Sequence, residues 1–172
     1  MDYLDQLESE SVYILREAYR TIHPLGMLWS LGKDSNVMLW LAKKAFLGRV
    51  PFPVVHVDTG KKFPEMYAFR DQYEEDWRLN LICGDCPPIE VIDASLPPAA
   101  RSAARKTEGL KALMAKEKFA GVFAGIRRDE QAVRAKERVF SPRGLDAEWE
   151  QHDQPAEFWG QYTTQMPLGS HI

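Results

Sequence analysis

Six residues, Ser30 to Ser35, have the composition of an anion-binding loop. The segment Ser-Leu-Gly-Lys-Asp-Ser follows a short apolar run at 27–29 and opens a stretch with helical apolar periodicity. Unpaired backbone N–H groups and the helix dipole make such a helix start favourable for phosphate. Gly32 allows close backbone approach, the two serine hydroxyls are donors, and Lys33 adds a positive charge. The loop is therefore predicted to bind a phosphate or pyrophosphate group.

This loop differs from the Walker A motif of nucleoside triphosphatases. Gly26 and Gly32 enclose five residues rather than four, and Asp34 instead of Ser or Thr follows the lysine. An acidic side chain beside phosphates is unfavourable unless a metal ion lies between them, so Asp34 predicts Mg²⁺ at this loop. The alternative interpretation is an ordinary helix start in which Asp34 or Ser35 is the N-cap.

The elements expected around the loop alternate between helix and strand. Apolar periodicity and chain breakers predict helices at 2–22, 35–47, 63–77 and 106–118, strands at 27–29, 53–57, 79–83 and 121–124, and a long loop at 84–104. Such alternation is typical of a parallel sheet with right-handed crossovers. The predicted fold class is therefore α/β, a Rossmann-like three-layer sandwich.

Polar segments follow three of the predicted strands, at 30–35, 58–60 and 125–130. Ligands of parallel sheets bind beyond the carboxyl ends of the strands, near the point where the strand order reverses. These three segments are therefore expected to converge on one site. Arg127 and Arg128 have a simpler alternative role, because acidic residues follow them and the group resembles a surface ion-pair network.

The composition is that of an ordinary globular protein in one domain, with 172 residues, 45% hydrophobic and 27% charged. No apolar stretch reaches the length of a membrane span and the first residues do not resemble a signal peptide, so a cytoplasmic location is expected. The net charge is −3, yet residues 101–143 hold just over half of the basic residues and a fifth of the acidic ones. One basic segment on an acidic chain favours a small-anion site over a nucleic-acid surface.

With these motifs in view, the chain resembles the phosphoadenylylsulfate reductase branch of the N-type ATP pyrophosphatases. Within that branch it is similar to the ATP-binding small subunits of bacterial sulfate adenylyltransferases. The matching segments are 30–35, 51–59, 106–111, 125–130 and 134–138. The resemblance covers essentially all of residues 1–172 and implies the adenine nucleotide alpha hydrolase-like form of the α/β fold. It implies an ATP pyrophosphatase domain at 1–143 and a C-terminal tail or flap at 144–172 packed on that domain.

The resemblance also implies roles for single residues. The 30–35 loop would hold the β,γ-pyrophosphate of ATP, with Mg²⁺ nearby. The Trp29 backbone, and residues 58–59 at the end of the second predicted strand, would flank adenine and ribose. Arg127 and Arg128 would face the α-phosphate and the attacking anion. The full set of expected nucleotide-binding residues is Trp29, Ser30, Leu31, Gly32, Lys33, Asp34, Ser35, Asp58, Thr59 and Gly125. The expected catalytic residues are Lys33, Lys106, Arg127 and Arg128, and the expected metal ligand is Asp34.

The reaction that the resemblance implies is adenylyl transfer to an oxyanion, most simply sulfate. The anion attacks the α-phosphorus of ATP and pyrophosphate leaves, so positioning and charge neutralisation supply the rate and no protein nucleophile is needed. The family implies a GTPase large subunit as partner, and a homo-oligomer is a further possible assembly. It also has a C-terminal region beyond the position of Ile172, so the sequence is expected to be a truncated or a minimal form.

Cys83 and Cys86 depart from this family pattern. The C-x-x-C spacing suits a redox pair, part of a metal site or the thiols of a sulfur-transfer enzyme. Two alternatives therefore stay open: a sulfur-transfer or phosphoadenylylsulfate reductase-type enzyme, and a nucleotide-binding domain that is inactive without a missing segment. The simplest interpretation is two unreactive thiols near a loop, with Cys83 at least partly buried at the end of its strand.

Overall fold

The structure, a computed structural model, describes residues 2–130, 132–144 and 154–165. Within these residues four parallel strands form one sheet in the order β3-β2-β1-β4. The strands are β1 (Leu25–Leu28), β2 (Val54–Asp58), β3 (Leu81–Asp85) and β4 (Gly121–Phe123). The chain moves outward from β1 to β3 and then returns to the other side of β1. The strand order therefore reverses between β1 and β4, and the crevice beyond their carboxyl ends is the expected ligand position.

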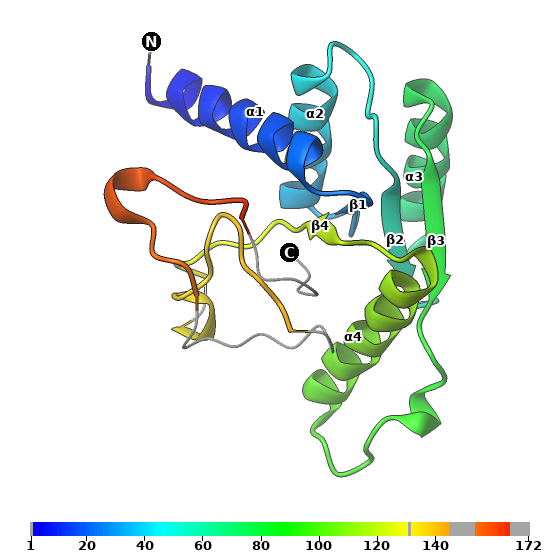
Figure 1. The fold of residues 1–172 in the computed structure, drawn as a ribbon. Helices are drawn as coiled ribbons and strands as arrows, with labels where there is room; N and C mark the ends of the chain where they lie inside the picture. Colours follow the sequence, from blue (N-terminus) through cyan, green and yellow to red (C-terminus); the bar gives the residue numbers. More distant parts are fainter. Residues whose placement is uncertain (1, 131, 145–153, 166–172) are drawn as a thin grey trace.

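Helices cover both faces of this sheet, so the predicted three-layer α/β class is confirmed (Figure 1). The helices are α1 (Tyr3–Thr21), α2 (Lys33–Ala45), α3 (Pro64–Trp77) and α4 (Pro98–Glu117). Figure 1 shows α4 on one side of the sheet and α1, α2 and α3 on the other. Short 3₁₀ turns occur at Ile89–Val91, Ala132–Arg134 and Phe158–Gly160. None of the described helices is long and apolar enough to cross a membrane.

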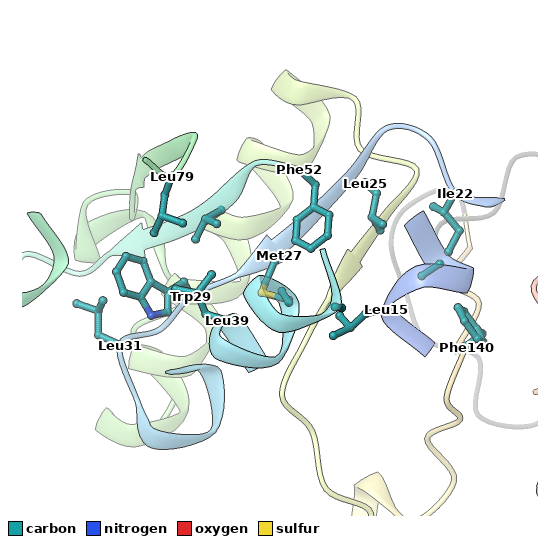
Figure 2. Close-up of a cluster of buried hydrophobic side chains, with 14 residues drawn as sticks. Leu15, Ile22, Leu25, Met27, Trp29, Leu31, Leu39, Phe52, Leu79 and Phe140 are labelled. Atoms are coloured by element: carbon teal, nitrogen blue, oxygen red, sulfur yellow. The ribbon is translucent and has the colours of Figure 1, made fainter. Parts of the chain in front are cut away.

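The larger part of the core lies between the sheet and the α1–α2 layer. Figure 2 shows its side chains extending from Trp29 and Leu31 to Leu15, Ile22 and Phe140. A smaller cluster of Val55, Leu113 and Phe119 joins the sheet to α4. Because successive strand residues point to opposite faces, β2 contributes to both clusters. This burial on two faces explains why the sequence of β2 is almost continuously apolar.

Several predicted boundaries were off by two residues or more, among them those of α4 and β3. Helix α4 begins at Pro98 rather than at residue 106, so part of the predicted 84–104 loop is helical. The segment after Pro98 is rich in alanine and arginine, which are strong helix formers, and proline is tolerated in the first turn. Strand β3 extends to Asp85 rather than ending at 83, because it pairs with β2 as far as Asp58. The first difference affects the candidate site, since α4 and the segment after β3 line a cleft beside Thr59.

The described part of the C-terminal tail contacts α1 and also the segment that precedes the tail in the sequence. The Tyr162 ring centroid lies 5.3 Å from that of Phe140 and 6.3 Å from that of Tyr13. Burial raises the pKa of Tyr162 to about 12. Arg138 Nε donates to the Pro155 carbonyl at 2.9 Å. The predicted division into a domain at 1–143 and a tail at 144–172 stays a prediction, and residues 145–153 and 166–172 lie outside the described chain.

His56 is fully buried in β2, with Nδ1 2.8 Å from the Trp29 carbonyl oxygen. A carbonyl only accepts, so Nδ1 carries the proton, and Nε2 is buried without a hydrogen-bond partner among the described residues. Burial lowers the pKa of His56 below 6.5, outweighing the hydrogen bond to Trp29. The unfolded chain therefore binds a proton that the folded chain does not, as the pH falls below about 6.5.

We expect the stability of the protein to fall as the pH is lowered from about 7 to 5, in part because of His56. The midpoint of urea unfolding measured across this range checks the effect. His56→Asn keeps an N–H donor near the Trp29 carbonyl and does not titrate, so its stability should depend less on pH. An equal pH dependence in both proteins would contradict the assignment to His56.

Candidate functional site

The 30–35 loop connects β1 to α2 at the carboxyl edge of the sheet. Its tight turn is made by Leu31, which has φ +66° and is buried, whereas Gly32 has φ −78°. Gly32 is the N-cap residue of α2 and supplies no side-chain hydrogen bond to the helix. Neither Asp34 nor Ser35 is therefore the N-cap, which corrects that detail of the alternative interpretation. The first-turn N–H groups of α2 have no side-chain cap, which leaves the helix start available to an anion.

The glycine at position 32 leaves open space over the helix start. A Cβ built there would make one tight contact, with Ser30 Oγ at 3.3 Å, and would otherwise have no neighbour within 4 Å beyond the adjoining residues. The absence of a side chain at Gly32, rather than its backbone freedom, thus keeps the loop accessible. Lys33 and Asp34 are exposed beside this space.

The two serines hold the loop in its conformation. Ser35 is buried and its hydroxyl donates to the Gly32 carbonyl at 3.0 Å. The Ser30 and Ser35 oxygens lie 3.0 Å apart, and the Gly32 N–H donates to Ser30 Oγ at 3.3 Å. With Ser35 donating to Gly32, Ser30 donates to Ser35 and the hydrogen bonds close into a ring. The loop is therefore organised before any ligand arrives.

Asn36 is a supporting residue that sequence reasoning missed. Its side-chain oxygen accepts from Trp29 Nε1 at 2.7 Å, and its amide nitrogen is 3.5 Å from the Leu31 carbonyl. These contacts connect the end of β1, the loop and the first turn of α2. The Trp29 side chain is buried, so only its backbone can face a ligand. Asn36 follows three other polar residues in the first turn of α2, so the local pattern did not single it out.

The end of β4 meets the 30–35 loop, as the strand order requires. A Cβ on Gly125 would lie 3.6 Å from Asp34 Cβ and 3.3 Å from Met38 Sδ, so the two segments are in contact. Hydrogen bonds from its guanidinium to Asp129 raise the pKa of Arg127, and the charge of Asp34 adds to the effect. The structure thus brings Asp34, Gly125 and Arg127 together.

Both predicted arginines are paired with carboxylates. Arg127 binds Asp129 with two hydrogen bonds, of 2.7 and 3.0 Å, at the surface. Arg128 pairs at 2.5 Å with Glu157 of the tail, and Glu157 also accepts from the Val139 N–H. An incoming anion must compete with these carboxylates for the guanidinium groups.

Asp58, at the end of β2, organises its own loop. Its carboxylate accepts from the Gly60 N–H and the Tyr67 hydroxyl, both at 2.9 Å, and Lys62 Nζ lies 3.6 Å away. Burial acts to raise the pKa of Asp58, but the bonds from Gly60 and Tyr67 hold it below the ordinary value. Asp58 therefore positions the neighbouring Thr59 backbone, which follows it at the sheet edge. Tyr67 was a contact that local sequence patterns did not indicate.

Lys106 is exposed on α4 and does not line the pocket that Arg128 lines. It lines a cleft with Thr59, whereas Arg128 lines a different cavity of about 570 Å³ with Leu28 and Thr107. The structure therefore does not bring Lys106 and Arg128 into one pocket. The predicted site extends along the sheet edge, with the 30–35 loop between its two basic ends.

The described residues contain no group of three or more His, Cys, Asp or Glu side chains that would hold a metal ion by themselves. Asp34 is a single exposed carboxylate at the start of α2. Mg²⁺ characteristically takes one or two carboxylates and completes its coordination with water and substrate phosphates. The donor set at Asp34 fits a metal of this kind and not a metal site built by the protein alone.

Cys83 and Cys86 are both free, and they differ in environment. Cys83 is exposed, so the expectation of at least partial burial was wrong. The reason is that β3 is the edge strand and Cys83 lies within it, opposite His56. Cys86 is buried, and its Cα lies 3.3 Å from the position of a Cβ on Gly109 of α4. Desolvation by its neighbours raises the pKa of the Cys83 thiol despite the nearby Arg70, which disfavours a reactive thiolate.

Comparison with known proteins identifies the family of this chain. Residues 24–152 match the family profile of the phosphoadenosine phosphosulfate reductase domain. Sulfate adenylyltransferase subunit 2 of Zymomonas mobilis is 43% identical, and that of Pseudomonas syringae is 44% identical, over the whole of this chain. The chain covers 58% of the length of each of these relatives.

Solved structures share the fold at low sequence identity. Phosphoadenylyl-sulfate reductase from Candida auris aligns with a TM-score of 0.52 at 17% identity, over 73% of this chain and 67% of that one. FMN adenylyltransferase from Candida glabrata, solved in complex with ATP, aligns with a TM-score of 0.55 at 17% identity, over 84% of this chain and 46% of that one. With the family profile matched over most of its length, the chain belongs to the phosphoadenosine phosphosulfate reductase domain family.

Proposed function

We propose that this protein binds Mg·ATP at the 30–35 loop and transfers its adenylyl group to sulfate, releasing pyrophosphate. The observation that carries the proposal is the meeting of the uncapped α2 start with the end of β4 at the reversal of strand order. The names of the relatives, sulfate adenylyltransferase subunit 2, support sulfate as the acceptor. The structure gives no equal support to a thiol reaction, because Cys86 is buried and the pKa of the Cys83 thiol is raised.

The geometry supports a division of tasks between the residues of this site. The N–H groups at the start of α2 and the Lys33 ammonium would bind the β- and γ-phosphates, where negative charge accumulates as pyrophosphate leaves. The backbone at Trp29, Leu31, Thr59 and Gly125 would border the nucleoside and the α-phosphate. Mg²⁺ held near Asp34 would neutralise phosphate charge. Arg127 and Arg128 would bind the oxyanion, because a planar guanidinium donates parallel hydrogen bonds to such groups.

The relatives are each named as subunit 2 of their enzyme. This supports the proposal that the protein works with another subunit, for which a GTPase is the candidate that the family resemblance implies. A high-energy mixed anhydride is the product, so coupling to a second energy source fits the chemistry. A cytoplasmic location, where ATP is present, is part of the same proposal.

Sulfate-dependent exchange of labelled pyrophosphate into ATP tests the proposed reaction. Exchange should require sulfate, Mg²⁺ and ATP together, since it reports reversal of adenylyl transfer. Exchange that is independent of sulfate, or its absence both with and without a co-expressed partner subunit, would count against the proposal.

Asp34→Asn should reduce the dependence of ATP binding on Mg²⁺. The carboxylate of Asp34 repels bare phosphates and attracts the metal, and the amide does neither. Calorimetric ATP titrations with and without Mg²⁺ measure this dependence for both proteins. If Asp34→Asn retains the full wild-type response to Mg²⁺, Asp34 is not the metal ligand.

The double change Cys83→Ser with Cys86→Ser should leave pyrophosphate exchange nearly intact. Adenylyl transfer needs no protein thiol, and the environments of the two cysteines are those of unreactive side chains. A modest loss of stability is expected from the buried Cys86. Loss of product formation with unchanged ATP binding would instead favour a sulfur-transfer enzyme.

A further inference from the structure

Strand β2 extends beyond the paired residues of its neighbour β1 at the carboxyl edge of the sheet. The β1 residues in register with β2 lie opposite Val54 and Val55, the first two residues of β2. Strand β2 continues to Asp58 and keeps β3 as its partner throughout, with Asp58 opposite Asp85. The ends of β2 and β3 therefore form a two-stranded ribbon, and Thr59 follows at its tip. Two strands alone are only marginally stable, so this tip needs support from another element.

Helix α4 packs closely against this ribbon because one of its residues is glycine. Gly109 is buried, and a Cβ built on it would lie 3.2 Å from Val57 Cγ1 and 3.3 Å from Cys86 Cα. A side chain at this position would therefore push α4 away from the ribbon. Arg105 lies one helical turn before Gly109, on the same face of α4, so the close packing brings its side chain to the tip.

The half-buried side chain of Arg105 connects the two ends of the ribbon. Its Nε donates to the Pro87 carbonyl at 2.5 Å and its Nη1 to the Thr59 carbonyl at 3.1 Å, while Nη2 lies 3.4 Å from the Cys86 carbonyl oxygen. All three acceptors are main-chain atoms. A guanidinium suits this arrangement because its donors are fixed in one plane. One side chain of α4 thus fixes the main chain after β2 to the main chain after β3.

The same tip is held from the opposite face of the sheet. Tyr67 of α3 donates to the Asp58 carboxylate at 2.9 Å, and α3 and α4 lie on opposite sides of the sheet (Figure 1). Tyr67 fixes the side chain of Asp58, whereas Arg105 fixes the main chain one residue later. The residue that is proposed to border the nucleoside, Thr59, is therefore positioned by the contact from α4.

We propose that Arg105 is a positioning residue for nucleotide binding, and that it acts through the Thr59 backbone rather than by contact with ATP. The role rests on the proposed function, which places ATP between the 30–35 loop and Thr59. With the tip held in place beforehand, ATP meets an ordered border for its nucleoside. Without Arg105, ATP would have to order the tip as it binds, and this cost would lower its affinity.

Calorimetric titrations with Mg·ATP and with Mg·tripolyphosphate test this role. Tripolyphosphate has the phosphates of ATP and no nucleoside, so it engages the 30–35 loop without needing the tip. Arg105→Met should weaken ATP binding about tenfold, because ATP must then order the tip, and should leave tripolyphosphate binding unchanged. Equal weakening of both ligands would show that Arg105 acts through its charge. That result, or unchanged ATP affinity, would overturn the proposal.

Two further variants control for charge and for folding. Arg105→Lys keeps the charge but replaces the planar fork by a single ammonium, so ATP should still bind more weakly than to the wild type. Wild-type ATP affinity in Arg105→Lys would count against the proposal. Arg16→Met is the matched control, because Arg16 Nε also donates to a main-chain carbonyl, that of Ala45 at the far end of α2. It should leave both affinities unchanged. Thermal unfolding checks each variant, and Arg105→Lys carries the comparison of the two ligands if Arg105→Met does not fold.

Hydrogen–deuterium exchange and enzyme kinetics separate this inference from the proposed function. The Cys86 N–H donates to the Asp58 carbonyl and the Gly60 N–H to the Asp58 carboxylate, so both amides report on the tip. Their deuterium exchange should be faster in Arg105→Met, with no change at the 30–35 loop. ATP binding that depends on Arg105, in a protein without pyrophosphate exchange, would retain the inference and reject the reaction. Pyrophosphate exchange with an unchanged KM for ATP in Arg105→Met would retain the reaction and reject the inference.

Discussion

Gly32→Val is expected to weaken ATP binding at least tenfold, a loss of about 1.4 kcal/mol or more. The N–H groups at the start of α2 carry no side-chain cap, and the space in front of them is open because residue 32 has no side chain. A branched side chain would fill the space that phosphates are proposed to occupy, and it would press on the Ser30 hydroxyl that helps to hold the loop. The φ of −78° at this position suits any residue, so the fold should persist. Calorimetric titration with Mg·ATP measures the affinity.

Two further variants control this experiment. Ala100→Val adds the same bulk at an exposed position near the start of α4 and should leave ATP affinity unchanged. Ser35→Ala opens the hydrogen-bond ring with Ser30 and Gly32 without filling the space, and should cost about 1–3 kcal/mol of ATP binding. Unchanged affinity in both Gly32→Val and Ser35→Ala would show that ATP binds elsewhere.

Replacing Arg127 or Arg128 by alanine should lower kcat about a hundredfold or more, with a smaller effect on ATP affinity. Charge moves on the α-phosphate and the leaving group during the reaction, and guanidinium groups stabilise this charge most in the transition state. The ion pairs of Arg127 with Asp129 and of Arg128 with Glu157 must open to bind an anion. The test is steady-state exchange kinetics, with nucleotide affinity measured separately.

Glu157→Gln isolates the effect of the tail on Arg128. If the carboxylate competes with the anion, its removal should lower the KM for the acceptor, and Arg128→Ala should cancel that gain. Lys116→Ala, which removes an exposed cation on α4, serves as the control for a general change in charge. If ATP affinity collapses in the arginine variants while the rate per bound nucleotide stays normal, the arginines only bind the nucleotide.

The sequence by itself determined the features that depend on neighbouring residues. An apolar run followed by serine, glycine and lysine at a helix start specifies a β-loop-α unit, since strand, turn and helix preferences act over a few residues. Repeated alternation of such units leaves few arrangements other than a parallel α/β sheet. The fold class and the position of the 30–35 loop were therefore predictable.

Only the tertiary structure decided which residues meet across the sheet. The position of β1 between β2 and β4 brings Gly125 against Asp34, and the placement of β3 at the edge exposes Cys83. Glu157 reaches Arg128 from far along the chain, and Arg105 joins two loops through backbone carbonyls. Such contacts depend on strand order and on backbone atoms, which every residue has, so no local residue pattern specifies them. The contact of Arg105 with Thr59 is accordingly a property of the folded chain, and it joins segments that local sequence patterns leave separate.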